Sequence, residues 1–196
     1  MIWYVARAGG VVAYLLLTFT VCLGIGLAGR ARVPGFPRLA VNDLHWFAGI
    51  LTGTFIAIHV GAILLDGYVH FSVAQVLVPL AASYRSLPVA FGIVAAELLI
   101  ALAVTNRLRR VLPRKLWRGA HYLNFAVWAS ATIHGITAGT DNATLWLMAI
   151  YVAAIATVGV LACWRFAESA GAGGAGTPVS NQVTRTATHV RTRAAS

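Results

Sequence analysis

Five long apolar segments dominate the sequence and restrict the folds that it can adopt. Each has about 20 residues, enough for a helix rising about 1.5 Å per residue to cross the hydrocarbon core of a bilayer. The 196 residues are 59% hydrophobic and 10% charged, which is too apolar for a soluble domain. We therefore expect an all-α membrane protein, a bundle of about five transmembrane helices at residues 10–29, 45–65, 87–105, 119–138 and 143–165.

The first apolar segment has a second interpretation, a removable signal peptide, because Arg7 precedes it. Its apolar run, VVAYLLLTFTVCLGIGLAG, is longer than a usual signal core. Arginines, rather than a small-residue cleavage site, follow that run. We expect the segment to be retained as a helix.

The C-terminal stretch differs in composition from the rest of the chain. Residues 167–196 are rich in Gly, Ala, Ser and Thr with scattered Arg, and they carry too little apolar surface to form a core. We expect one membrane domain at residues 1–166 and a disordered cytoplasmic tail at 167–196. His189 lies in this tail, and we expect it to be a solvated residue without a ligand role.

The cations are distributed unevenly between the two ends of the predicted helices. Arg7 and Arg85 lie on one side, and all the other Lys and Arg residues lie on the opposite side. The positive-inside rule makes the second side cytoplasmic, with the N-terminus outside and the C-terminus inside the plasma (inner) membrane. Topology and contact with anionic membrane lipid then account for the net charge of +10, and we expect no nucleic-acid partner.

Four of the six histidines form two matched pairs within the apolar segments. His45 and His59 lie in the second segment with a separation of 14 (59 − 45), and His121 and His134 lie in the fourth with a separation of 13 (134 − 121). Both segments follow cytoplasmic loops, so both run from inside to outside. Ionisable groups in a membrane are costly, and imidazole is a strong axial ligand of haem iron.

The matched depths predict two bis-histidine haem sites between the second and fourth helices. His45 pairs with His121 at an inner haem, and His59 pairs with His134 at an outer haem. The two irons would lie roughly 20 Å apart along the helix axes. The expected cofactors are therefore two haem b groups.

Helix phase agrees with this arrangement for one pair only. At about 100° per residue, His45 and His59 point within about 40° of each other around a regular helix. His121 and His134 point about 140° apart. Two explanations stay open at this point. Either the fourth segment is locally distorted, or its two imidazoles leave opposite flanks of the helix.

Small and aromatic residues lie near and between the predicted depths of the two haems. Gly49 and Gly53 would let a porphyrin approach the helix backbone, or would let two helices pack closely. Phe55, Phe125 and Trp128 fall between the two histidine levels, where they would line the gap between haems or simply form core. The sequence leaves both alternatives open.

Haem propionates need cationic partners near the membrane surfaces. Arg38, Arg114, Lys115 and Arg118 crowd the inner face, and Arg85 lies on the outer face. We take Arg118 and Arg85 as the first candidates, with a plain topological role as the alternative.

The expected environments of two other ionisable residues, Glu97 and His70, are less direct to assign. Glu97 is near the middle of the third segment, and we expect it to be protonated and hydrogen-bonded inside the bundle, with proton coupling as the alternative. His70 lies in the outer loop with Asp66, and we expect a surface residue rather than part of an acceptor site.

The histidine segments also resemble a known family. Residues 8–166 are similar to the ferric reductase-like transmembrane domain, which includes NADPH oxidases, ferric reductases and the haem-binding membrane subunit of bacterial methionine sulfoxide reductase. Small bacterial stand-alone members are the most similar. The 14-and-13 histidine spacing is a specific part of the resemblance, which rests on DLHWFAGILTGTFIAIHVGAILLD, VPLAASYRSLPVAFG and NRLRRVLPRKLWRGAHYLNFAVWASATIHGITAGTD.

The resemblance implies a membrane b-type cytochrome that moves single electrons across the bilayer, as an oxidoreductase or an electron-transfer subunit. The four histidines match the ligand positions of the family. No GxGxxG fingerprint is present, and we expect no flavin or nicotinamide domain within the chain. The donor would be a separate flavoprotein or quinol, and the external acceptor would be ferric iron, oxygen or a partner oxidoreductase.

Two other functions remain open. The chain could be a haem-binding membrane subunit that docks a separate catalytic reductase, as in the sulfoxide reductase. It could also be a non-redox transporter component whose histidines serve metal or proton passage.

Overall fold

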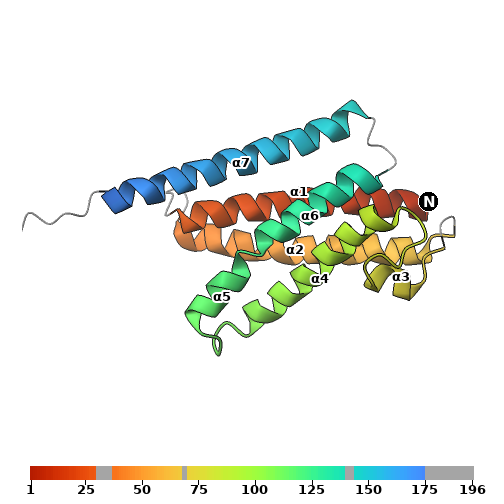
Figure 1. Cartoon of the computed structure of the whole chain (residues 1–196), viewed down its shortest axis with the longest axis horizontal. Helices are drawn as coiled ribbons and strands as arrows, with labels where there is room; N and C mark the ends of the chain where they lie inside the picture. The colour runs from red at the N-terminus through yellow and green to blue at the C-terminus, as the bar shows by residue number, and fades with distance from the viewer. Residues whose placement is uncertain (30–36, 68–69, 140–143, 175–196) are drawn as a thin grey trace, which may run out of the picture. The chain divides into compact units, whose positions relative to one another are not determined.

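The computed structural model describes residues 1–29, 37–67, 70–139 and 144–174, and these residues are mainly helical (Figure 1). The expected all-α fold is confirmed for this part of the chain. The helices are α1 (Ile2–Ala28), α2 (Arg38–Leu65), α3 (Val73–Leu77), α4 (Ser86–Arg107), α5 (Arg114–His121), α6 (Asn124–Ala138) and α7 (Leu145–Gly174).

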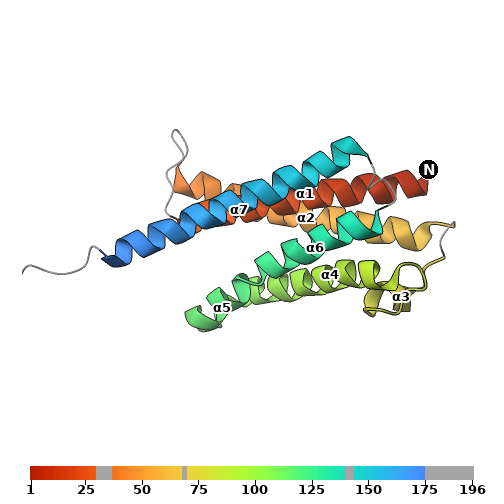
Figure 2. The ribbon, with the colours of Figure 1, turned by 45° about the horizontal axis from the view of Figure 1, so that its top comes forward.

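Helix α1 is the central element of the first compact unit, Met1–Leu161. It packs along α2 and also along α6, and α6 packs in turn along α4 (Figures 1 and 2). Side-chain contacts show that α1 and α2 are antiparallel, since His45 reaches Thr20 whereas His59 reaches Ala6. The closely packed helix pairs of the described residues do not include α2 with α6.

The core of this unit lies between α1, α4, α6 and the first part of α7. One cluster of buried apolar residues joins Leu17 and Val21 of α1 to Leu102 of α4 and Val127 of α6. A second cluster is aromatic, with the rings of Tyr14 and Tyr151 centred 4.9 Å apart. Small side chains such as Ala95 and Ala154 let the helices approach closely, as is usual in membrane bundles.

Within the described residues, four helices are long and apolar enough to cross a membrane, namely α1, α2, α4 and the Leu145–Ala170 part of α7. This agrees with a multi-pass membrane protein. The expected number of crossings was about five, and the difference lies in the segment 119–138. Helix α6 has 15 residues and rises only about 22 Å, less than the thickness of the hydrocarbon core.

The segment 119–138 is interrupted at Tyr122 and Leu123. Helix α5 ends at His121 and α6 begins at Asn124. Tight turns join the two helices, because the Leu123 amide donates to the Ala120 carbonyl and the Phe125 amide donates to Tyr122. Of the two explanations left open for the spacing of His121 and His134, this break supports a local distortion of the segment.

The helix ends differ from the predicted bounds in three other places. Helix α1 begins eight residues earlier than its predicted bound, and α2 begins seven residues earlier, so that α2 includes the polar residues Asn42 and Asp43. Helix α7 continues to Gly174, into the predicted tail, because the alanines after Arg165 favour helix. The short helix α3 was not predicted, and a capping box between Ser72 and Gln75 begins it.

The second compact unit begins at Ala162, within α7, and runs to Ser196. Its described part is the last portion of α7, up to Gly174. The rest of the predicted tail, with His189, lies outside the described residues.

Candidate haem site

The structure brings the four helical histidines together in the two predicted pairs. The ring centres of His45 and His121 are 6.2 Å apart, and those of His59 and His134 are 6.3 Å apart. Each pair joins α2 to the α5–α6 segment, although α2 and α6 do not pack closely in the described part of the chain. The rings of each pair therefore meet where the two helix backbones are not in close contact.

The separation of the rings matches that of two axial ligands. Metal–nitrogen bonds of about 2.0 Å, with about 1.2 Å from each nitrogen to its ring centre, place two opposed imidazoles about 6.4 Å apart. A direct hydrogen bond between the rings would place the centres at about 5.3 Å. An edge-to-face ring contact covers a similar range of distances, so the orientation of the ring nitrogens decides between the two interpretations.

Three of the four imidazoles are held through Nδ1 by a backbone carbonyl of a neighbouring helix. The Nδ1 atom of His45 donates to the Thr20 carbonyl (3.0 Å), and that of His59 donates to the Ala6 carbonyl (2.6 Å). The Nδ1 atom of His134 donates to the Pro88 carbonyl (2.9 Å). A carbonyl can only accept, so Nδ1 carries the proton and Nε2 keeps its lone pair. Metal-bound histidines are held in this way, and the bond to the carbonyl fixes the tautomer of the ring.

Each of these three carbonyls is followed four residues later by a glycine. The pairs are Ala6 with Gly10, Thr20 with Gly24 and Pro88 with Gly92. In a helix, the β-carbon of residue i+4 lies over the carbonyl of residue i, so a side chain there would block a second hydrogen bond. A β-carbon at Gly92 would lie 2.7 Å from Nδ1 of His134, and one at Gly10 would lie 2.9 Å from Nδ1 of His59.

The fourth imidazole, His121, is held differently. Its ring stacks on Trp117, with ring centres 5.3 Å apart and planes 25° from parallel. The Trp117 indole donates to the Asn106 side chain, which ties α5 to the end of α4. Near Nδ1 of His121 the structure has the Asn124 amide at 3.4 Å instead of a carbonyl. The inner pair is therefore less firmly oriented than the outer pair.

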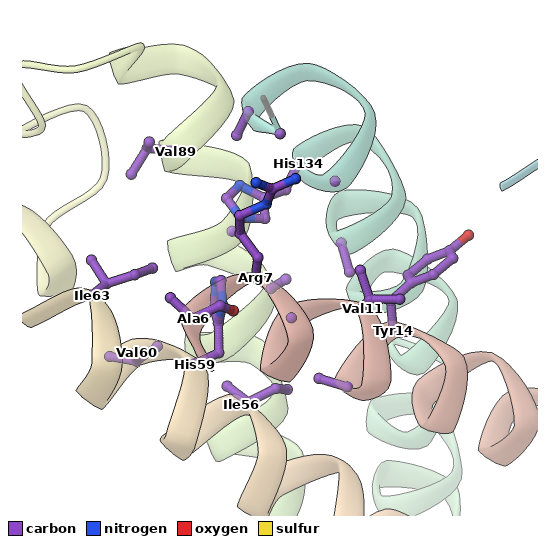
Figure 3. Close-up of a pocket in the computed structure, with 18 of the residues that line it drawn as sticks. Ala6, Arg7, Val11, Tyr14, Ile56, His59, Val60, Ile63, Val89 and His134 are labelled. Carbon is purple, nitrogen blue, oxygen red and sulfur yellow. The ribbon is translucent and has the colours of Figure 1, made fainter. Parts of the chain in front are cut away.

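The outer histidines line a cavity of ≈ 700 Å³, a volume typical of small-molecule and cofactor sites (Figure 3). Its wall is mainly apolar and includes Val11, Ile56 and Ile93 together with the phenol of Tyr14. Figure 3 shows His59 rising from α2 and His134 from α6 into this space. A flat, largely apolar cofactor with two axial ligands fits such a cavity.

The structure bears on the alternatives for the residues between the two histidine levels. A β-carbon at Gly49 or Gly53 would meet no atom within 4 Å, so these glycines do not serve close helix packing within the described part of the chain. Trp128 packs in the core, and its indole donates to Thr18 of α1. Phe125 is 39% exposed.

The cations near the sites are placed unevenly. The Arg85 guanidinium donates to the carbonyl of Thr137, three residues beyond His134 (2.9 Å). Arg7 of α1 lines the outer cavity with both histidines, although sequence reasoning had used it only for topology (Figure 3). At the other end, Arg118 is exposed on α5 and Arg38 donates to the Leu27 carbonyl.

Two further ionisable residues are exposed. His70 lies at the surface, as expected. Glu97 is exposed on α4, so its predicted position inside the bundle is wrong. The histidine-facing side of α4 is the side of Gly92, and five residues later the helix has turned by about 140°, which points Glu97 away from it.

Each histidine pair offers two imidazole donors. Among the described residues, no group of three or more His, Cys, Asp or Glu side chains could hold a metal ion. Haem differs in this respect, because the porphyrin supplies four ligands and the protein needs to add only two.

No family model matches the chain, and no match is found among curated proteins or solved structures.

Proposed function

We propose that the chain is a membrane b-type cytochrome with two haems, an inner one held by His45 and His121 and an outer one held by His59 and His134. The observation that carries the proposal is the repeated geometry of the two pairs. In both, the rings lie at the separation of axial ligands, and three of the four rings are held through Nδ1 by a carbonyl, which leaves the Nε2 lone pair free to bind iron.

Bound haem would supply reversible one-electron chemistry. The chain itself would orient the axial imidazoles and enclose the outer haem in apolar side chains. The carbonyls of Ala6, Thr20 and Pro88 fix the imidazole tautomers and increase the basicity of Nε2. The mainly apolar wall around the outer pair would surround the haem with groups of low polarity, which helps to set its redox potential.

The two pairs lie at opposite ends of α2, which suits electron transfer from one side of a membrane to the other. With the orientation given by the positive-inside rule, the donor would be a separate flavoprotein or quinol, and the acceptor at the outer pair would be ferric iron, oxygen or a partner oxidoreductase. The resemblance to the ferric reductase-like family supports this assignment and a place in the plasma membrane.

The deciding test is haem stoichiometry in the detergent-purified full chain. We expect about two b haems per chain by pyridine haemochrome, with a low-spin reduced-minus-oxidised spectrum, because two bis-histidine sites are present. One haem per chain would limit the proposal to a single site. A colourless protein from haem-supplied cells would contradict it and favour a transporter role.

Arg7 should set the potential of the outer haem. Replacing it with Gln removes a positive charge that stabilises the electron-rich reduced state, so the potential should fall by some tens of millivolts, because a unit charge beside a partly buried redox centre contributes about 1–2 kcal/mol at an effective dielectric of about 20. Spectroelectrochemical titration of the two haems measures this shift. Arg118→Gln is the matched control at the other end and should leave the outer potential unchanged; an equal shift in both variants would contradict a local role for Arg7.

A further inference from the structure

The exposed carboxyl of Glu97 lies at the centre of an apolar helix. Helix α4 begins at Ser86 and ends at Arg107, and Glu97 lies almost midway between them. Its distances from these two ends correspond to about 16 Å and 15 Å of helix rise, so a membrane-spanning α4 places Glu97 near mid-depth.

Nothing in the described part of the chain satisfies this carboxyl. Glu97 has neither a hydrogen bond nor an ion pair there, and its neighbours on the same face are apolar. Ile100 is 64% exposed and Val104 is 52% exposed. An ionisable side chain at this depth is costly in lipid and normally faces protein or a water-filled cavity. This face of α4 therefore needs a polar partner at the same depth.

We propose that this face binds a second copy of the chain, in a symmetric dimer in which the two Glu97 carboxyls hydrogen-bond to each other. A protonated carboxyl is both a donor and an acceptor, so two of them satisfy one another with two hydrogen bonds. A twofold axis along the membrane normal brings the same residue of both copies to the same depth.

The distribution of charge favours this pair over an ion pair between copies. The described spans of the first compact unit carry their arginines toward the helix ends, at Arg7, Arg38 and Arg107. A second copy inserted in the same direction therefore offers Glu97 another carboxyl at mid-depth, and no cation from those spans. The proposal does not depend on haem binding.

The test is the oligomeric state of the full chain in lipid vesicles over a range of protein-to-lipid ratios, by single-molecule photobleaching. We expect a dimer for the native chain and for Glu97→Gln, whose amide is also self-complementary. Glu97→Leu should raise the dimer dissociation constant about tenfold, because both hydrogen bonds are lost. A native chain that stays monomeric, or a dimer unaffected by Glu97→Leu, would overturn the proposal and assign Glu97 to another partner.

Disulfide cross-linking gives a second measurement that does not alter Glu97. In a background with Cys22→Ala and Cys163→Ala, Ala101→Cys should cross-link, because residue 101 lies within about 40° of Glu97 on the helix. Ala103→Cys is the matched control. It is likewise exposed but about 120° away, and it should not cross-link. Preferential cross-linking through residue 103 would contradict the proposed face.

Discussion

Replacing His59 or His134 with Ala should halve the haem content of the purified chain, from about two haems to about one, and should leave the inner spectrum largely intact. The physical reason is that each variant removes one of the two axial ligands of the outer site. Replacing His45 or His121 should do the reverse. Pyridine haemochrome gives the number of haems, and redox titration shows which haem remains.

The surrounding helices should survive these substitutions. The carbonyls of Ala6, Thr20 and Pro88 lie within α1 and α4, where intrahelical bonds still satisfy them once an imidazole is removed. His70→Ala is the matched control, since its exposed ring lies in the outer loop, and it should leave the haem content unchanged. Loss of both haems from any single histidine variant would show that the two sites fold together.

The pairing of the histidines could be predicted from the sequence, because it depends on depth. Residue number along a helix converts directly to height in a membrane, and the positive-inside rule gives the direction of each helix. These two rules were enough to match His45 with His121 and His59 with His134, and the structure brings the same residues together. Their ligand role remains a prediction.

The break between α5 and α6 could not be predicted, because the apolar run continues through it. Tyr122 and Leu123 are acceptable helix residues, and no Gly or Pro marks the interruption. The only signal was indirect. The spacing of His121 and His134 cannot place both side chains on one face of a regular helix, and a distortion between them was one of the two explanations that the sequence left open.

Glu97 was misplaced for a different reason. Hydropathy located it in the middle of a span but does not give the face on which it lies. The favoured position inside the bundle assumed that a single chain satisfies its own polar groups. A carboxyl that faces outward follows naturally if another molecule completes the membrane assembly.

The glycines that support the imidazoles left a signal that sequence reasoning did not use. Gly10 and Gly24 have the same spacing along the chain as His45 and His59 (24 − 10 and 59 − 45). Two antiparallel helices in contact preserve such a spacing, so the match points to α1 as the helix that carries the supporting carbonyls. Gly92 had no comparable partner, and only the structure places it against His134.

Gly92→Ala should therefore disrupt the outer site from a position that holds no ligand. The new β-carbon would lie 2.7 Å from Nδ1 and 2.8 Å from Cε1 of His134, closer than side chains pack. The imidazole must move away, which breaks its bond to the Pro88 carbonyl and turns Nε2 out of line with His59. We expect at least a twofold loss of outer haem, and a shifted low-spin electron paramagnetic resonance signal from the fraction that stays bound.

The control for Gly92→Ala is Gly61→Ala on α2, where a β-carbon would meet no atom within 4 Å. Both substitutions replace a helical glycine and so should raise the intrinsic stability of the helix by a similar amount, about 1 kcal/mol. Their effects on backbone stability therefore cancel in the comparison, and the difference in outer haem reports the contact with His134. Retention of both haems with an unchanged resonance signal in Gly92→Ala would show that the Pro88 carbonyl does not orient a ligand, and that Gly92 serves only helix packing.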